Sequence, residues 1–107
     1  MSAQFYIGQI IYHKRFNYRG VIVGIDAVFS HSEYWYENMA SSRPPKDKPW
    51  YNVLVDQSLQ STYVAERNLL ANEDDSQIDH PFLGHYFDKY DGRRYYLKSK
   101  HLKPKPH

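Results

Sequence analysis

The sequence contains no cysteine, and this absence excludes a disulfide framework, a thiolate metal site and a cysteine nucleophile. Long hydrophobic runs are also missing, because every apolar stretch is far shorter than the ~20 residues that a membrane-spanning helix needs. The chain does not open with a charged segment followed by an apolar one, as a secretion signal does. We therefore expect a soluble protein, cytoplasmic or associated with the nucleoid, that has no membrane partner.

Glycine is scarce, with five residues, and none of them falls in a Gly-x-Ser-x-Gly, Gly-x-Gly-x-x-Gly or phosphate-binding loop pattern. His80 and His85 are five residues apart, a spacing that does not place two imidazoles on one helix face. His13 and His31 have no acidic residue at ligand spacing, and the adjacent carboxylates of residues 74–75 lack apolar surroundings. We therefore predict that the chain is not an enzyme and holds neither a metal ion nor another cofactor.

Aromatic residues are abundant: they make up 17% of the 107 residues, and eleven of them are tyrosines. A hydrophobic fraction of 41% is enough to build one core in a chain of this length. We therefore expect a single domain over residues 1–107, with a folded core over residues 5–97 and a basic, lysine- and proline-rich tail over residues 98–107. The last six residues are either a solvated tail or part of a cationic face.

Charge is distributed unevenly along the chain, although the net charge is only +2. Residues 1–25 hold three bases and no acid, residues 26–91 hold twelve acids against five bases, and residues 92–107 hold six bases and no acid. If the fold brings the two ends together, as compact domains often do, up to nine cations form one face. Such a face suits phosphate groups or acidic protein surfaces.

Short runs of β-branched and aromatic residues predict five strands. They lie at residues 5–12, 21–26, 51–56, 61–65 and 94–97. The four-residue loop between the third and fourth runs has the length of a hairpin connection, and Gly24 within the second run predicts a bulge. Apolar residues on both faces of these strands indicate a small closed barrel whose outer face is also covered.

Two segments carry helical patterns. Residues 32–39 predict a short helix with Ser32 as its N-cap, since Trp35 and Met39 lie one turn apart. Residues 81–90 predict a second helix that starts at a proline, carries one apolar stripe and stops at an Asp-Gly pair. Between the first helix and the third strand, residues 40–49 contain three prolines and predict a surface loop.

Three runs of residues form an ordered set: residues 13–26 (HKRFNYRGVIVGID), residues 50–56 (WYNVLVD) and residues 61–69 (STYVAERNL). This set resembles the YccV-like, or hemimethylated-DNA-binding, domain family, and the similarity covers about residues 5–97. Within that range, residues 78–95 are more similar to the version carried by a eukaryotic F-box protein than to the short bacterial form, whose best-known member is a heat-shock protein.

The resemblance implies a mostly β fold, namely a small SH3-like barrel of about five strands with one or two short helices. It also implies a function without catalysis, for which the family suggests two forms. The first is DNA binding, with hemimethylated DNA as the partner. The alternative is an adaptor or modulator of ATP-dependent proteolysis and protein quality control that binds a protease or a client protein. Self-association into a homo-oligomer is a further trait that the resemblance implies.

Candidate site residues combine the basic segments with the motif runs, because cations beside aromatic rings suit contacts with phosphates and bases. The predicted nucleic-acid contacts are Lys14, Arg15, Arg19, Arg93, Arg94 and Lys98. The predicted partner or stacking surface comprises Trp35, Tyr36 and Trp50, of which the first two are candidates to touch an adenine methyl in the major groove. For Trp50, a place in the core is the competing interpretation. A half-buried, mutually paired polar cluster is predicted for His13 and Glu66 together with Arg19 and Asn68.

Overall fold

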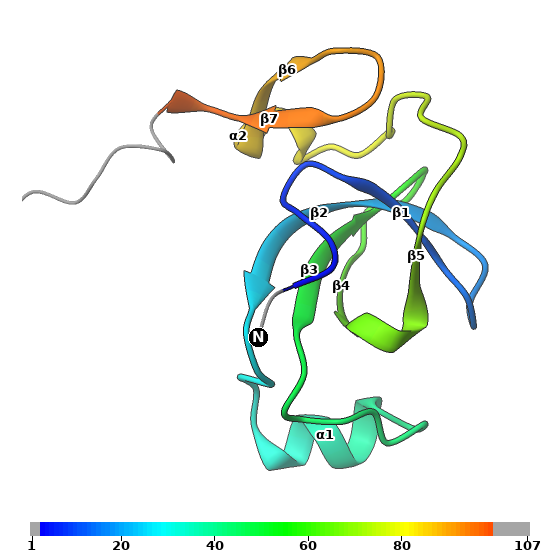
Figure 1. The fold of residues 1–107 in the computed structure, drawn as a ribbon, viewed down its shortest axis with the longest axis vertical. Helices are drawn as coiled ribbons and strands as arrows, with labels where there is room; N and C mark the ends of the chain where they lie inside the picture. The colour runs from blue at the N-terminus through cyan, green and yellow to red at the C-terminus, as the bar shows by residue number, and fades with distance from the viewer. Residues whose placement is uncertain (1–2, 100–107) are drawn as a thin grey trace, which may run out of the picture.

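The computed structural model describes residues 3–99, and residues 100–107 of the predicted basic tail lie outside the described residues. A five-stranded antiparallel sheet has the order β4-β3-β2-β1-β5, and a separate two-stranded sheet pairs β6 with β7 (Figure 1). The strands are β1 (Ile10–His13), β2 (Arg19–Asp26), β3 (Trp50–Val55), β4 (Ser61–Ala65), β5 (Leu69–Ala71), β6 (Phe87–Tyr90) and β7 (Tyr95–Leu97). The helices are α1 (Glu33–Met39), α2 (Leu83–Tyr86) and the 3-10 helix η1 (Glu66–Asn68). This mostly β architecture with short helices confirms the predicted fold class.

One face of the five-stranded sheet carries a fully buried apolar core, and we call it the inner face. Successive residues of a strand point to opposite faces, so alternate residues of each strand supply this core. Its buried side chains are Ile11, Ile22, Tyr51, Val53, Val64 and Leu69. The N-terminal segment packs against them through Ala3 and Phe5. Because all five strands contribute, this core holds the sheet together.

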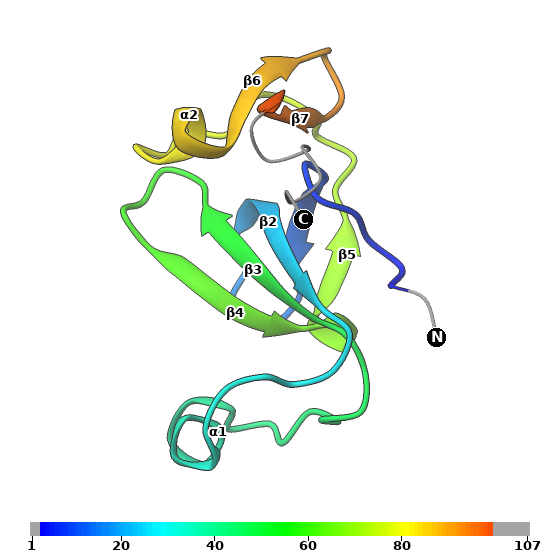
Figure 2. The same cartoon turned by 90° about the vertical axis from the view of Figure 1, so that its left-hand side faces the viewer.

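The outer face of the same sheet is covered by two separate structures, one at each end (Figures 1 and 2). At one end, the β6–β7 hairpin packs Phe87 and Tyr95 into a cluster with Val21 of β2. At the other end, α1 and the segment before it cover Trp50, which is 2% exposed and lies 5.0 Å from the Phe29 ring between centroids. Coverage on both sides explains why the strands are apolar on both faces.

The five-stranded sheet is open, which corrects the expectation of a closed barrel. β4 and β5 form its two edges, and η1 connects them in the chain. The pairing between β2 and β3 shifts register between Ile22 and Gly24, where one extra residue is inserted. This shift confirms the bulge predicted at Gly24, and such bulges bend a strand and increase its twist.

β1 starts at Ile10, later than the strand predicted over residues 5–12. Gly8 has a φ of +92°, outside the extended region, and the Gln9 N–H donates to the Tyr6 carbonyl at 3.1 Å. This turn presents the Gly8 carbonyl to the N–H of Tyr95, which donates to it at 2.9 Å. The residues before β1 therefore anchor the C-terminal hairpin instead of lengthening the strand.

The helix predicted over residues 81–90 is wrong in its second half. α2 ends at Tyr86, and Phe87 begins β6, which pairs antiparallel with β7. The apolar stripe that suits a helix also suits this hairpin, because Phe87 is buried against Tyr95 with 5.3 Å between ring centroids. Pairing with a strand that follows in the sequence outweighs the local helical pattern.

The Asp91-Gly92 pair closes the hairpin. The Asp91 carboxylate accepts the backbone N–H groups of Arg93 and Arg94, both at 3.0 Å, and the hydroxyl of Tyr96 at 2.7 Å. Gly92 has a φ of +96°, which glycine adopts without steric cost. Hydrogen bonding, first from Tyr96 and then from the two backbone groups, lowers the pKa of Asp91 to about 2. The carboxylate is therefore ionised, as this turn requires.

α1 confirms the predicted helix and its cap, since Ser32 Oγ accepts the N–H of Trp35 at 3.1 Å. Residues 40–49 form the predicted loop, and the Trp50 indole N–H donates to the Pro45 carbonyl at 3.0 Å. In the described part of the chain, no helix is both long enough and apolar enough to span a membrane.

Candidate nucleic-acid interface

The turn between β1 and β2 presents two cations to solvent. His13 is buried at the end of β1, and its Nδ1 accepts the backbone N–H groups of Arg15 and Phe16, each at 3.1 Å. The Lys14 N–H donates to the Asn68 carbonyl at 2.9 Å, which joins the turn to the end of η1. These hydrogen bonds fix the backbone of the turn, while the side chains of Lys14 and Arg15 are exposed.

A concavity of about 670 Å³ lies beside this turn and is lined by three cations. Lys14 comes from the turn, Lys48 from the loop before β3, and Arg67 from η1. The Arg67 Nη2 donates to the Ser42 carbonyl at 2.6 Å, which joins η1 to the loop. We call Lys14, Arg15, Lys48 and Arg67 the cationic rim. All four side chains are exposed, and none forms an ion pair within the described part of the chain.

Glu66 is the carboxylate among the residues described as lining this concavity. Its Oε2 accepts the Tyr51 hydroxyl at 2.5 Å and the Gln4 N–H at 2.9 Å. Burial, followed by the hydrogen bond from this hydroxyl to Glu66, raises the pKa of Tyr51, so the phenol stays protonated and continues to donate. Glu66 is thus bound to the N-terminal segment and the inner core, and the concavity retains an excess of positive charge.

Lys48 and Arg67 are functional candidates that the sequence reasoning missed. Both belong to residues 26–91, which carry twelve acids against five bases. The net negative charge of this segment gives no indication of two exposed cations within it. Arg67 lies within the third motif run, between Glu66 and Asn68, and no periodicity marks it. Only the folding of η1 and of the loop onto the β1–β2 turn brings these two cations beside Lys14.

Arg19, a predicted phosphate contact, is occupied within the fold. Its side chain is 17% exposed, and its Nη2 lies 3.1 Å from Asp56 Oδ2. Its Nη1 also donates to the carbonyls of Asp74 and Ser76 at 2.7 and 3.0 Å. The guanidinium therefore fastens the segment between β5 and α2 to the sheet, and most of its donors are used within the fold.

Arg94, another predicted phosphate contact, is also engaged within the fold. Its Cζ lies 4.0 Å from the centroid of the Tyr6 ring and 4.9 Å from that of Tyr96. Its Nη2 donates to the Ile7 carbonyl at 3.2 Å. Stacking and hydrogen bonding thus make Arg94 part of the contact between the C-terminal hairpin and the N-terminal segment.

Arg93 and Lys98 lie on the C-terminal hairpin, in different surroundings from the cationic rim. Arg93 is exposed and borders a hollow that is also lined by Glu73 and Asp75. Lys98 is half-buried and follows β7, where its N–H donates to the Tyr86 carbonyl at 2.9 Å. The carboxylates of Glu73 and Asp75 therefore reduce the positive electrostatic potential at Arg93, because opposite charges at short range offset each other.

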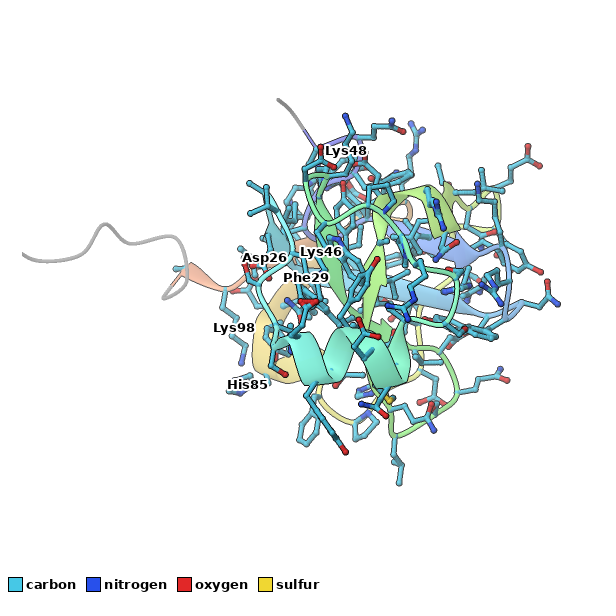
Figure 3. All side chains as sticks on the ribbon, turned by 90° about the horizontal axis from the view of Figure 1, so that it is seen from below. Asp26, Phe29, Lys46, Lys48, His85 and Lys98 are labelled. Carbon is cyan, nitrogen blue, oxygen red and sulfur yellow. The ribbon has the colours of Figure 1, made fainter. Side chains whose placement is uncertain are left out.

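Within residues 3–99, the cations of the two chain ends do not form one face, which corrects that expectation for the described residues. The C-terminal hairpin is anchored at Gly8, whereas Lys14 and Arg15 follow the far end of β1. Six residues of extended chain separate positions 8 and 14, a distance of about 20 Å. Figure 3 likewise shows Lys48 and Lys98 well apart when the molecule is seen from below. The described cations of the two ends therefore form two groups, and no member of the cationic rim has an ion-pair partner among the described residues.

Two of the three rings predicted to form a stacking surface are buried. Tyr36 is 7% exposed and Trp50 is 2% exposed, so neither ring offers a face to a ligand, and the interpretation of Trp50 as a core residue is correct. Trp35 is half-buried, with centroids 5.9 Å from Phe29 and 5.5 Å from Tyr63. Figure 3 shows Phe29 beside α1, where these rings gather. The three rings mainly hold α1 on the sheet.

The predicted mutual pairing of the polar cluster is wrong, because its members have separate partners. His13 accepts two backbone N–H groups of its own turn, Arg19 pairs with Asp56, and Glu66 accepts from Tyr51 and Gln4. Asn68 contributes its carbonyl to the β1–β2 turn. Each polar residue within an apolar motif run instead satisfies local hydrogen-bonding groups, as buried polar atoms must.

Acidification is expected to loosen the β1–β2 turn through His13. Burial, with the Arg15 charge adding to it, lowers the pKa of His13 below its ordinary value of 6.5, and its neutral Nδ1 accepts two N–H groups. A histidine with a depressed folded-state pKa contributes stability that is complete above the unfolded-state pKa and is lost as the pH falls below it. The free energy of unfolding should therefore fall below about pH 6.5.

Urea denaturation of the wild type and of His13→Asn at about pH 7.5 and 5.5 measures this loss. The asparagine carbonyl retains a hydrogen-bond acceptor but does not titrate in this range. The variant should therefore lose less stability on acidification than the wild type does. Equal losses in the two proteins would contradict the assignment of the pH dependence to His13.

Comparison with known proteins extends these observations. Residues 3–94 match the family model described as "Hemimethylated DNA-binding protein YccV like". F-box only protein 21 of Homo sapiens is 37% identical over 91 residues, and F-box only protein 21 of Mus musculus is 36% identical over 91 residues. Each match covers 83% of this chain but only 14% of the relative, so the chain spans a small part of the length of these relatives.

The region matched by the family model contains the five-stranded sheet, the helices α1, η1 and α2, and all four residues of the cationic rim. It also contains the three motif runs on which the resemblance in the sequence rests. Because the model matches most of the chain, from residue 3 to residue 94, the chain belongs to the YccV-like family.

Proposed function

We propose that the chain binds double-stranded DNA through the cationic rim. The observation that carries this proposal is the convergence of Lys14, Lys48 and Arg67, from three separate segments, on one concavity without ion-pair partners among the described residues. Cations of this kind neutralise phosphates and release the counterions condensed on DNA, which is the main source of affinity that does not depend on sequence. The description of the family, which names hemimethylated DNA, supports the same ligand.

The acidic middle of the chain does not oppose DNA at this face, because several of its carboxylates are neutralised elsewhere. Glu37 pairs with Arg43 at 2.8 Å, and Asp56 pairs with Arg19 at 3.1 Å. The acidic segment over residues 73–75 lies near Arg19 and Arg93, on the side of the C-terminal hairpin. A duplex seated on the cationic rim therefore faces the part of the chain where bases exceed acids.

Phe16 supplies an apolar contact for a methyl group within the same surface. Its side chain is 66% exposed, and the Arg15 guanidinium lies 5.7 Å from the centroid of its ring. A methyl on adenine projects into the major groove, where apolar side chains make contact with such groups. Burying one methyl against Phe16 gains ~0.8 kcal/mol, which corresponds to a preference of about fourfold for a methylated strand.

A titration of three duplexes that differ only in methylation, on neither, one or both strands, tests this function. With four phosphate contacts, the affinity should fall by about 10² between 50 and 200 mM salt, because each contact contributes a slope of about −0.9. The hemimethylated duplex should bind about fourfold more tightly than the unmethylated one, and Phe16→Ser should abolish that difference but keep the salt slope. A salt-independent response would refute DNA binding through the cationic rim.

A further inference from the structure

The outer edge of β4 carries backbone groups that face away from the sheet. The Val55 N–H donates to the Gln60 carbonyl and the Glu66 N–H donates to the Pro49 carbonyl, both at 3.1 Å. In an antiparallel pair, the backbone groups of successive residues point alternately towards the partner strand and away from it. These two bonds show that the backbone groups of residues 60, 62, 64 and 66 point towards β3. The N–H and C=O groups of Ser61 and Tyr63 therefore point away from β3, along the free edge of the sheet.

A cavity of about 540 Å³ runs along this same edge. Its lining includes consecutive residues of β4, from Ser61 to Val64, whose side chains point alternately to the inner and the outer face. Side chains from both faces of one strand can line a single cavity only if the cavity follows the edge of that strand. The cavity is therefore open to the outward N–H and C=O groups of Ser61 and Tyr63.

Apolar and aromatic side chains form the two walls of this cavity. On the inner side stands Tyr18, whose hydroxyl is hydrogen-bonded to Thr62 Oγ1 at 2.7 Å. On the outer side stand Trp35 and Met39 of α1, and the Met39 side chain is 66% exposed. His31 completes this wall, with its ring centroid 4.1 Å from that of Tyr63. The tilted and T-shaped ring contacts fix the wall before any ligand arrives.

The hydroxyl of Tyr63 is anchored by two hydrogen bonds to other parts of the fold. It donates to Asp26 Oδ2 at 2.6 Å and accepts the Ser30 N–H at 3.0 Å. The Tyr63 ring is also stacked on Trp50, with 5.2 Å between centroids. Because the side chain is anchored in this way, the outward backbone groups of Tyr63 are presented on a rigid strand, and little conformational entropy is lost when a partner pairs with them.

The charge around the cavity favours an acidic partner. Among the residues described as lining it, none is a carboxylate. Arg15 lines an adjoining hollow together with Phe16, Trp35 and Met39, which also line the cavity. A ligand that carries a carboxylate at this end meets the Arg15 guanidinium, which has no ion-pair partner among the described residues, so its charge is complementary to the site.

We infer that the edge of β4 and this cavity bind an extended peptide segment of another protein as an added antiparallel or parallel strand. The peptide pairs with the backbone N–H and C=O groups of Ser61 and Tyr63. Its apolar side chains alternate between the wall of Tyr18 and the wall of Trp35 and Met39, and an acidic residue lies near Arg15. The backbone contributes affinity and the two walls contribute sequence preference, as in other cases of strand addition. This cavity is distinct from the concavity assigned to DNA, although Arg15 and Phe16 belong to both surfaces.

Selection from a library of random 12-residue peptides displayed on phage, against the whole chain, provides the probe. Enriched peptides should carry apolar residues at alternate positions and an acidic residue at one end. A synthetic copy should bind Ser61→Pro about tenfold or more weakly than the wild type, because proline removes an outward N–H that the sheet does not use. Ser61→Ala retains this N–H, so its affinity for the peptide should stay within about twofold of the wild type.

Two further measurements use the wild type and test strand addition even if Ser61→Pro folds poorly. N-methylation of the peptide amides that point towards β4 should abolish binding to the wild type. N-methylation of the intervening amides, which point away from β4, should leave binding unchanged. In hydrogen exchange, the amides of Ser61 and Tyr63 should exchange fast in the free chain and become protected by the peptide, while those of Thr62 and Val64 are protected throughout.

Four outcomes would overturn the inference. They are the absence of any enriched peptide, equal binding to Ser61→Pro and Ser61→Ala, displacement of the peptide by single-stranded oligothymidylate, and a dimer in sedimentation that Ser61→Pro dissociates. Displacement by the oligothymidylate would assign the cavity to single-stranded nucleic acid. A dimer that Ser61→Pro dissociates would assign the edge of β4 to a second copy of the chain. Affinity for duplex DNA should be the same in Ser61→Pro and the wild type, so this test is independent of DNA binding.

Discussion

Replacing Lys14, Lys48 and Arg67 together by glutamine is expected to weaken duplex binding on the order of 10³-fold at 50 mM salt. The three side chains come from the β1–β2 turn, the loop before β3 and η1, and they line one concavity. The loss of three phosphate contacts should reduce the salt slope by about 2.7, so the defect should shrink about 40-fold, to about 25-fold at 200 mM salt. Fluorescence anisotropy with a labelled duplex over a series of salt concentrations measures both quantities.

The matched control removes two cations of the C-terminal hairpin by the double substitution Arg93→Gln and Lys98→Gln. Arg93 lies beside Glu73 and Asp75, and Lys98 lies far from the cationic rim. This variant should keep the affinity of the wild type within about threefold and leave the salt slope unchanged, since its cations make no phosphate contact. If the control lost as much affinity as the triple variant, DNA would be bound by the hairpin and the proposed interface would be incorrect.

Gly8→Ala should lower the free energy of unfolding by about 3 kcal/mol or more. The backbone at Gly8 has a φ of +92°, which side chains with a Cβ rarely adopt. A Cβ at this position would also lie 2.0 Å from the carbonyl oxygen of Tyr95, so the backbone of the hairpin would have to move. The hydrogen bond from the Tyr95 N–H to the Gly8 carbonyl, at 2.9 Å, would be lost at the same time.

Gly84→Ala is the control, since nothing lies within 4 Å of a Cβ placed there, and the residue belongs to the short helix α2. Its stability should equal that of the wild type or exceed it by up to about 1 kcal/mol, because alanine favours helix over glycine. Urea denaturation of the three proteins compares these free energies. A loss below about 1 kcal/mol for Gly8→Ala would mean that the hairpin tolerates displacement from the N-terminal segment.

Short elements with a local chemical signal are predictable from this sequence. Ser32 carries a hydroxyl that can cap a helix, and it does cap α1. Residues 61–65 were predicted as a strand with the bounds that β4 has in the structure. Gly24 indicates a bulge because a strand interior gains nothing from glycine, and the register shift lies there. In each case, the cause of the structure lies within a few residues of the signal.

Elements that depend on a distant partner were missed. β5 is three residues long, only Leu69 of it is buried, and it is a strand because β1 offers it an edge. β6 carries an apolar spacing that suits a helix, and its pairing with β7 decides between the two structures. Arg94 looks like a free cation in the sequence, but Tyr6 and Ile7, more than eighty residues away, bind it.

By itself, the sequence determined the family, the mostly β character and the places where the chain turns, because motif runs, alternation and capping residues act over short distances. Only the tertiary structure decided which charges are free. Arg19 and Lys14 are both basic residues of the same motif run, yet Arg19 is held by Asp56 and by three backbone carbonyls of residues 74–77, whereas Lys14 is exposed beside Lys48 and Arg67. Charge interactions act through space, and their partners here lie tens of residues apart in the chain.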